Sequence, residues 1–422
     1  MQQQDGLLSR LRRGHEQLVL DLLRTHGPLS RGELGARCGL SRTTLYDIVG
    51  ALVGNGAVVA AAPEAGPRKR GRPVERLALN PDAGLAIGID FARRAVHVSA
   101  VNVAHEVVGS ATRPHGPDLG WAERADLAEH LIRGLAGDSL RLDALSAIGV
   151  GVVGPVVGPP VTAADDALSG AGPAAPAETA APAGPSTAGD GWDAVARLVG
   201  GRFDVPVFVD NNTRLAALAE STWGAAAGAG DVLYLRLSHG VGGGLIVGGA
   251  PHRGAYGMSG EFGHITVVPD GAACECGGTG CLETVASVGA VLEAYRAAGG
   301  RAGDIAEVTA AARDGEAVAV GVLAEVGRRI GTVLAAVCNA IGPGVIVVGG
   351  ELAAAGKALT GPVEDALAAG LLPVARDRID LRPAALGEVG AALGGIALVL
   401  RDSPQLHGHP VARAAGAHGG TR

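Results

Sequence analysis

One histidine and three cysteines lie close together in the second half of the chain. His264, Cys274, Cys276 and Cys281 follow the spacing H-x9-C-x-C-x4-C. Zn²⁺ favours four nitrogen and sulfur ligands in a tetrahedron, and one imidazole with three thiolates supplies them. Because protein groups fill all four positions, none is left for an activated water. We therefore expect a structural zinc ion that holds a glycine-rich loop; three buried free cysteines and a redox centre are the alternatives.

Residues near the N-terminus have types and spacing suited to DNA contact. Helices are predicted around 15–26, 31–38 and 41–54, and the short turn Gly39-Leu40-Ser41 between the last two is typical of a helix-turn-helix. The start of such a second helix contacts base edges, where the forked Arg42 side chain suits guanine. A helix-turn-helix that binds protein is the alternative. The candidate DNA contacts in this helix are Ser41, Arg42, Thr43, Thr44 and Tyr46.

A basic loop follows this region and predicts a wing. Short strands at 58–59 and 77–79 enclose a stretch rich in glycine, proline and basic residues. The basic side chains of this loop would contact DNA phosphates or enter the minor groove of DNA. A solvated basic linker is the alternative. The candidate wing contacts are Arg68, Lys69, Arg70 and Arg72.

The charge of the chain changes along its length. Residues 1–80 hold 12 Lys+Arg and 7 Asp+Glu, a net charge of +5, whereas the remainder holds 23 and 35, a net charge of −12. A basic head on an acidic body predicts that the head meets a polyanion such as double-stranded DNA. The first residues lack the apolar core of a secretory signal, and no run reaches the roughly 18 apolar residues of a membrane span. We therefore expect a cytoplasmic protein without membrane contact.

The rest of the chain has an α/β pattern. Strand-rich segments followed by helices occur twice, which predicts a two-lobed α/β body. In the second of these segments, a glycine turn at 240–244 is expected between strands 231–237 and 245–247. The expected domains are 1–80 (winged helix-turn-helix), 81–213 (first lobe, with a low-complexity, disordered loop at 155–190), 214–402 (second lobe with the zinc site, its final helix 390–402 packing on the first lobe) and 403–422 (disordered tail).

The cysteine region resembles the signature of the ROK family. Glu261-Phe-Gly-His264 is followed by C-x-C-G-G-x-G-C-L-E, which ends at Glu283. This family contains bacterial sugar kinases and sugar-responsive repressors, and the winged helix-turn-helix resembles the repressor branch. The resemblance implies a two-lobed actin-like ATPase (ribonuclease H-like) sugar-kinase fold with a sugar site in the cleft between the lobes.

The resemblance also implies which residues bind the sugar. Carboxylates, amides and an imidazole can hydrogen-bond to neighbouring hydroxyls, and the second ring nitrogen of His264 would remain for the sugar. Alternatives stay open: Asn211 as a turn residue, the two glutamates as solvated loop charges, and His264 as a ligand of zinc alone. The implied sugar-binding residues are Asn211, Asn212, Glu261, His264 and Glu283.

Two positions depart from the kinase pattern. The family's kinases carry an aspartate base where this chain has Asn212, and an amide cannot remove the hydroxyl proton. Their first phosphate loop is D-x-G-G-T, whereas Asp90 is followed here by Phe-Ala-Arg93-Arg94, without the glycines that let backbone approach phosphate. Arg93 and Arg94 could contact a phosphorylated sugar or simply be solvated. We therefore expect no enzyme activity.

These observations predict a DNA-binding transcription regulator, a repressor of carbohydrate metabolism genes, with a sugar or sugar phosphate as its effector. A homodimer or a dimer of dimers would match paired operator half-sites. An active ATP-dependent sugar kinase is one alternative. A regulator that has lost its sugar ligand, or that senses a protein partner, is another.

Overall fold

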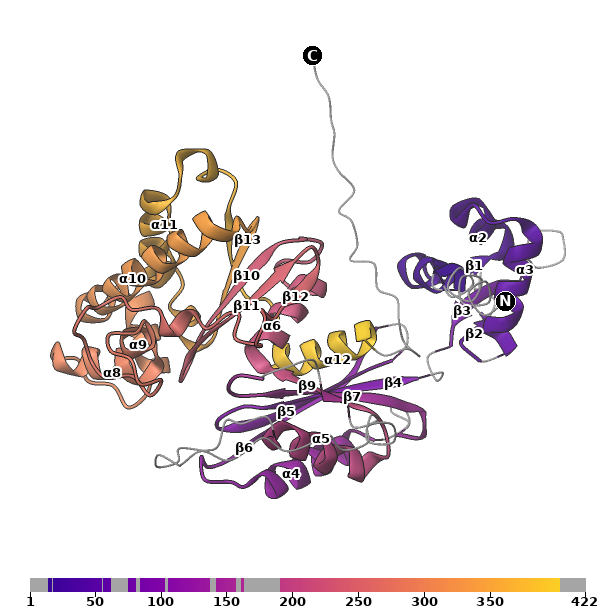
Figure 1. Cartoon of the computed structure of the whole chain (residues 1–422), viewed down its shortest axis with the longest axis horizontal. Coiled ribbons are helices and arrows are strands. Elements are labelled where there is room, and N and C mark those ends of the chain that lie inside the picture. Colours follow the sequence, from indigo (N-terminus) through magenta and orange to yellow (C-terminus); the bar gives the residue numbers. More distant parts are fainter. Residues whose placement is uncertain are drawn as a thin grey trace, which may run out of the picture.

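The computed structural model describes residues 14–16, 18–54, 56–61, 75–80, 84–102, 105–136, 142–156, 161–162 and 190–402. They form a small N-terminal domain and two larger α/β lobes, which Figure 1 shows as three bodies. Within these residues, no helix combines the length and the apolar character needed to cross a membrane.

The described N-terminal residues combine a helix-turn-helix with a small antiparallel sheet. The turn at Gly39 has a left-handed backbone (φ 67°), and Ser30 and Glu33 form the expected capping box. Strand β3 lies in the centre of a three-stranded antiparallel sheet of order β1-β3-β2. The elements are helical residues 18–26, β1 (Leu29–Ser30), α2 (Arg31–Cys38), α3 (Arg42–Gly54), β2 (Val58–Ala60) and β3 (Arg76–Leu79).

Lobe 1 is built on a six-stranded mixed sheet of order β6-β5-β4-β7-β9-β8. Strands β4, β7 and β9 run parallel, so their carboxyl ends meet at one edge. Helices α4 (Trp121–Leu135) and α5 (Asp190–Phe203) pack on one face. The strands are β4 (Leu85–Phe91), β5 (Ala95–Asn102), β6 (Val107–Pro114), β7 (Leu145–Val152), β8 (Val161–Thr162) and β9 (Val207–Asn211).

Lobe 2 has a five-stranded sheet of order β12-β11-β10-β13-β14 and a cluster of helices. The strands are β10 (Val232–Leu237), β11 (Val241–Val247), β12 (Ala250–His252), β13 (Val345–Gly349) and β14 (Asp380–Pro383). The helices are α7 (Glu283–Ala286), α8 (Val288–Ala297), α9 (Ile305–Arg313), α10 (Ala317–Ile341) and α11 (Lys357–Gly370), with the 3-10 turn η3 (Phe262–His264) before α7.

Two helices connect the lobes. Helix α6 (Asn212–Thr222) leaves lobe 1 directly after β9 and packs on β10 and β11 of lobe 2. Helix α12 (Gly390–Asp402) lies against α6 and the β4–β7 face of lobe 1 (Figure 1). A Cβ on Gly88 would lie 1.7 Å from the carbonyl oxygen of Ala392, so glycine permits this close approach. Arg401 of α12 also donates to the Gly249 carbonyl of lobe 2 at 3.0 Å.

The structure differs from the sequence prediction in three places. The glycines expected to form a turn at 240–244 lie mostly inside β11, because close packing rather than turning requires them: a Cβ on Gly243 would lie 2.2 Å from the Phe262 ring. The expected domain boundary at 213/214 falls inside α6, because that helix begins at the carboxyl end of β9 without a linker. Helix α11, whose interior contains Pro362, was not anticipated.

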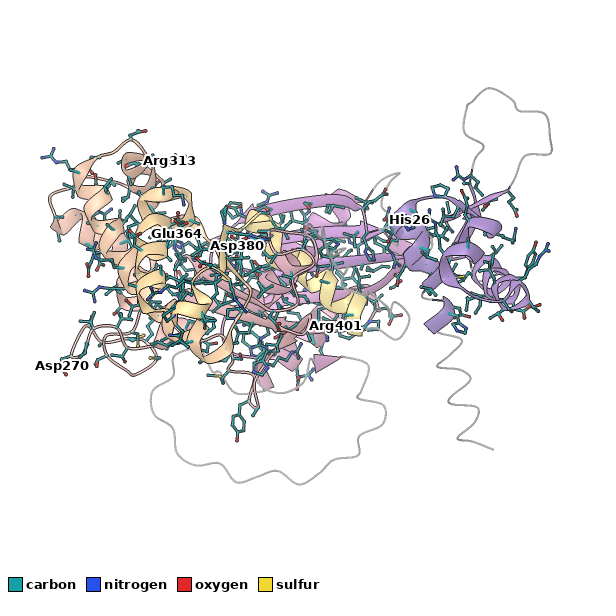
Figure 2. All side chains as sticks on the ribbon, turned by 90° about the horizontal axis from the view of Figure 1, so that it is seen from above. His26, Asp270, Arg313, Glu364, Asp380 and Arg401 are labelled. Atoms are coloured by element: carbon teal, nitrogen blue, oxygen red, sulfur yellow. The ribbon has the colours of Figure 1, made fainter. Side chains whose placement is uncertain are left out.

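Parts of the sequence prediction lie outside the described residues. The wing residues Arg68, Lys69, Arg70 and Arg72 fall in 62–74, and the tail is 403–422. Of the loop at 155–190, only 155–156, the strand β8 and the first residue of α5 are described. Residues 265–282 form the cysteine-bearing loop. Figure 2 shows His26 of the N-terminal domain and Asp270 of this loop far apart along the long axis.

Candidate functional site

The four predicted metal ligands converge. Their ligand atoms all lie within 4.8 Å of one another, with 3.6 Å between Cys274 Sγ and His264 Nδ1 and 3.7 Å between Cys276 Sγ and Cys281 Sγ. A tetrahedral zinc ion, with bonds near 2.3 Å to sulfur and 2.0 Å to nitrogen, would separate its ligand atoms by about 3.5–3.8 Å. The donor set and its spacing therefore fit a metal ion, and zinc best.

The backbone around these ligands is a tight loop with little side-chain mass. Isolated antiparallel β-bridges join Thr266 to Cys281 and Ala273 to Thr279, and they hold the two sides of the loop together. Gly280 has φ 64°, and a Cβ there would lie 1.7 Å from the Val268 carbonyl oxygen, so only glycine fits. Because the loop has few apolar contacts of its own, a metal ion held by four side chains would supply the missing cross-links.

The imidazole of His264 faces two ways. Its Nδ1 lies toward the cysteine cluster, whereas its Nε2 is 3.8 Å from Oε2 of Glu261. A metal bound at Nδ1 would therefore fix the ring and leave Nε2 beside Glu261. The dual role expected for His264, in which one nitrogen binds metal and the other meets a ligand, stays a prediction.

The two glutamates of the signature have different environments. Glu261 is partly exposed; burial raises its pKa, and nearby His264 and Arg214 oppose that shift. Glu283 Oε2 accepts a hydrogen bond of 2.8 Å from the Val241 amide at the start of β11. Glu283 is thus anchored to the lobe 2 sheet, while its other carboxylate oxygen can still accept a ligand's hydroxyl.

The side chain of Asn211 already makes three hydrogen bonds within the protein. Its Oδ1 caps α6 by accepting from the amides of Thr213 (2.9 Å) and Arg214 (3.0 Å), and its Nδ2 donates to the Gly154 carbonyl at 2.9 Å. A sugar bond to this side chain would share or displace one of these bonds. The turn-residue alternative raised from the sequence thus describes this arrangement, with the specific role of a helix cap.

Asn212 is tied to the first strand of lobe 1. Its Nδ2 donates to Oδ1 of Asp90 at 3.1 Å, and both side chains are buried. An amide at this position satisfies one oxygen of the buried carboxylate, which a second carboxylate would repel. The contact joins residues 122 positions apart.

A buried ion cluster that the sequence did not reveal lies beside Asn211. Asp210, with no exposed surface, pairs with Arg214 of α6 at 2.6 Å and with Arg253, which follows β12, at 2.7 Å. Arg214 also donates to the Gly257 carbonyl at 2.7 Å. The cluster fastens the loop that leads to Glu261 onto the carboxyl end of β9. Asp210 directly precedes the candidate residue Asn211 in the sequence, but no sequence pattern indicated that Arg253 would be its partner.

The candidate DNA-facing residues lie on one exposed surface of α3. Ser41 Oγ accepts from the Thr44 amide at 3.1 Å, as an N-cap does. Arg42, Thr43 and Tyr46 are exposed, whereas Leu45 and Ile48 are buried. The Arg31 guanidinium carbon lies 5.3 Å from the centre of the Tyr46 ring, and that of Arg42 lies 6.0 Å away. Two cations therefore flank one exposed aromatic ring.

Both a glucokinase and a transcription regulator of known sequence resemble part of this chain. A glucokinase of Halalkalibacterium halodurans is 37% identical over 206 residues, covering 45% of this chain and 62% of the relative. The DNA-binding transcriptional dual regulator NagC of Escherichia coli K12 is 34% identical over 216 residues, covering 47% of this chain and 51% of NagC. The chain thus spans less than two thirds of either relative.

A solved structure extends the similarity over most of the chain. The crystal structure of a ROK family transcriptional regulator, a homologue of the Escherichia coli MLC protein, superimposes with a TM-score of 0.71 at 25% identity. The match covers 92% of this chain and 95% of that protein. The ROK family profile matches residues 122–402, most of the two lobes, and the chain therefore belongs to the ROK family.

Proposed function

We propose that the protein is a sugar-responsive transcription regulator whose ROK body binds a carbohydrate without phosphorylating it. The observation that carries the proposal is Asn212: at the position of the kinase base it offers an amide, and that amide already donates to Asp90. Proton removal from a sugar hydroxyl needs a basic group within hydrogen-bond reach. The altered sequence after Asp90 removes the glycines of the first phosphate loop as well.

The N-terminal domain supports the DNA-binding part of the proposal. Residues 1–80 make up less than a fifth of the chain, so a match over 92% of it with a transcription regulator reaches into this domain. The exposed start of α3, with Arg42 and Tyr46, has the shape and charge for a major groove. The direction of regulation we propose, repression, rests on the similarity to the repressor branch.

DNA binding is tested by selecting sequences from genomic DNA and measuring affinity at about 150 mM salt, where charge alone gives weak binding. We expect sequence-preferring binding that Arg42→Gln weakens by about 10-fold or more, as loss of a bidentate base contact does. Arg313→Gln, at an exposed arginine in the last turn of α9 in lobe 2, is the matched control. Equal affinity for all sequences contradicts the proposal.

Sugar binding is tested by thermal shift with hexoses, pentoses and N-acetylhexosamines, each free and phosphorylated. A ligand that binds only the folded protein stabilises it by RT ln(1 + [L]/Kd), so its unfolding midpoint rises with the logarithm of ligand concentration once that exceeds Kd. Hits are then added to the protein–DNA complex, and we expect release of DNA. A body that no sugar stabilises would favour the regulator without a carbohydrate ligand.

The metal and the assembly complete the proposal. We infer one structural zinc per chain, held by His264 and the three cysteines, which elemental analysis of the purified protein measures. We also propose a cytoplasmic homodimer or dimer of dimers, which light scattering measures and which paired half-sites in the selected DNA would reflect.

A sugar kinase is the second candidate, favoured by the 37% identity to a glucokinase. An assay of ADP release across the same sugars separates the two. Sugar-dependent turnover above about 1 s⁻¹, within the usual range of kinases, would establish the kinase and reject the role given to Asn212.

A further inference from the structure

Arg31 is a cation beside the candidate DNA-facing residues of α3 that the sequence did not single out. It is the first residue of α2, directly after the N-cap Ser30. Its guanidinium carbon lies 5.3 Å from the centre of the Tyr46 ring of α3, and that of Arg42 lies 6.0 Å from the same ring. In Figure 1, α2 and α3 belong to the same small domain and are in contact. The exposed surface of α3 therefore continues onto α2 through one aromatic ring.

An acid next to β3 already pairs with Arg31. Ser30 of β1 pairs in register with Arg76 of β3, and this antiparallel register sets Arg31 opposite Glu75, the residue before β3. Nη1 of Arg31 donates to Oε2 of Glu75. Both side chains keep contact with water, since they are 30% and 55% exposed. An ion pair in water contributes little free energy, because solvent and salt screen it, so a stronger anion can displace Glu75.

The pair uses only part of the Arg31 guanidinium. A guanidinium has five N–H donors in a planar fork that suits two oxygens of a carboxylate or a phosphate. Among the described residues, the bond from Nη1 to Glu75 is the only hydrogen bond of this side chain, and its Nε is buried without a hydrogen-bond partner. The free protein thus leaves most of the hydrogen-bonding capacity of this cation unmet.

The position of Arg31 predicts which part of DNA it meets. In a helix-turn-helix, the second helix enters the major groove and the first crosses the phosphate backbone. Arg31 starts the first of these helices, whereas Arg42 starts the second. Arg31 would therefore meet phosphate where Arg42 meets base edges. DNA competes better for a cation than one exposed carboxylate does, because binding also releases the counterions condensed on the duplex.

We propose that Arg31 contacts a DNA phosphate and that Glu75 masks it in the free protein. On binding, the guanidinium exchanges the Glu75 carboxylate for a phosphate oxygen and stays on the Tyr46 ring. This inference rests on the DNA-binding part of the proposed function. Glu75 lowers affinity in this scheme, so the two partners of one ion pair act on DNA binding in opposite directions.

A purely structural role for the pair makes a different prediction. If Arg31 and Glu75 only held α2 against β3, loss of either partner would loosen the domain and weaken DNA binding. The two elements are also joined by Arg76 and Glu33, whose charged atoms are 3.7 Å apart, and by the pairing of β1 with β3. Removing the Glu75 carboxylate therefore leaves other links between α2 and the sheet in place.

The salt dependence of DNA binding by the full chain tests the exchange. Affinity for the DNA selected from the genome and for an unrelated duplex is measured between about 100 and 300 mM salt. We expect Arg31→Gln to weaken both by about fivefold near 150 mM salt and to lower the slope of log affinity against log salt by about 0.9, the loss of one phosphate contact. We expect Glu75→Gln to strengthen both by about two- to fivefold without changing the slope.

Further variants show whether the acid acts through the arginine. In the double variant Arg31→Gln with Glu75→Gln, the gain from Glu75→Gln should vanish, since the two residues share one interaction. Arg31→Lys keeps a point charge that binds phosphate and should retain the full slope. Lys357→Gln and Glu364→Gln, at an exposed ion pair of 2.8 Å on α11 of lobe 2, are the matched controls for net charge and should leave affinity unchanged.

The outcomes separate this inference from the proposed function. Sequence-preferring binding with an unchanged slope in Arg31→Gln, a slope lost equally in Arg31→Lys, or weaker binding by Glu75→Gln overturns the exchange and leaves the regulator standing. A gain from Glu75→Gln that persists in the double variant overturns it too, because the acid would then repel DNA directly. A slope lowered by Arg31→Gln with equal affinity for all sequences leaves the phosphate contact standing and removes sequence-specific regulation. No DNA binding by the wild type at about 50 mM salt rejects both.

Discussion

The cysteine-bearing loop and the buried region around Asp90 and Asn212 arrange their polar side chains in different ways. In the loop, four possible metal-ligand atoms from within one short segment lie within 4.8 Å of one another. Around Asp90 the polar groups come from two distant segments: its Oδ1 accepts from Asn212, while its buried Oδ2 has no hydrogen-bond partner among the described residues. The first arrangement suits an ion held permanently, whereas the second commits the Asn212 amide to the protein itself.

The largest expected effect comes from the loop. Cys281→Ala removes a buried ligand and should abolish stoichiometric metal binding, lowering the unfolding midpoint by roughly 10 °C because loss of a structural metal is among the most destabilising changes. Calorimetry with elemental analysis measures both. Cys338→Ala, a buried cysteine of α10 outside the cluster, should retain the metal in full. If Cys281→Ala kept its metal, the tetrahedral assignment would be wrong.

Glu261→Gln probes the sugar side of the same loop. Loss of a charged acceptor should weaken sugar binding about 10- to 100-fold, the range for hydrogen bonds to charged groups, while zinc content stays constant. Titration calorimetry with the best sugar of the thermal-shift panel measures the affinity. Glu293→Gln, an exposed acid on α8, is the control. An unchanged affinity would place the sugar elsewhere.

The substitution Asn212→Asp tests whether a carboxylate restored at the position of the kinase base also restores phosphoryl transfer to a sugar. The new carboxylate would stand against Asp90, where the amide now donates at 3.1 Å, so we expect about 1–3 kcal/mol less stability and no ADP release. Adding Asp90→Asn should restore most of the stability by removing the like charge. Turnover in the single variant would show that the remaining cleft is still a kinase site.

Asp90→Asn alone should reveal a pH dependence. Burial raises the pKa of Asp90 in the folded protein, so its ionisation works against folding as the pH rises from its unfolded value through the folded pKa. The variant lacks this penalty. Its gain in unfolding free energy over wild type should therefore be small near pH 4 and grow toward pH 8, as urea unfolding measures. Asp365→Asn, exposed on α11, is the control, and a gain that shrinks with pH contradicts the assignment.

Local signals in the sequence predicted local structure well. The capping box of Ser30 and Glu33 and the left-handed Gly39 place α2 correctly, because both depend on residues within one helical turn. The spacing of His264 and the three cysteines predicted a cluster that the fold brings together. The glycines of β11 were misassigned, since glycine serves equally for a turn and for close packing, and only the neighbour across the contact distinguishes these uses.

The sequence by itself determined the kinds of groups in this protein: the metal ligands, the basic head, and the amide where a kinase has its base. Only the tertiary structure decided which groups meet. Asn211 caps α6, Asp210 pairs with two arginines, and Asp90 accepts a hydrogen bond from the distant Asn212. Such contacts depend on how two sheets are set around α6 and α12. Strand and helix periodicity reports which face of an element is buried, but not which distant element covers it.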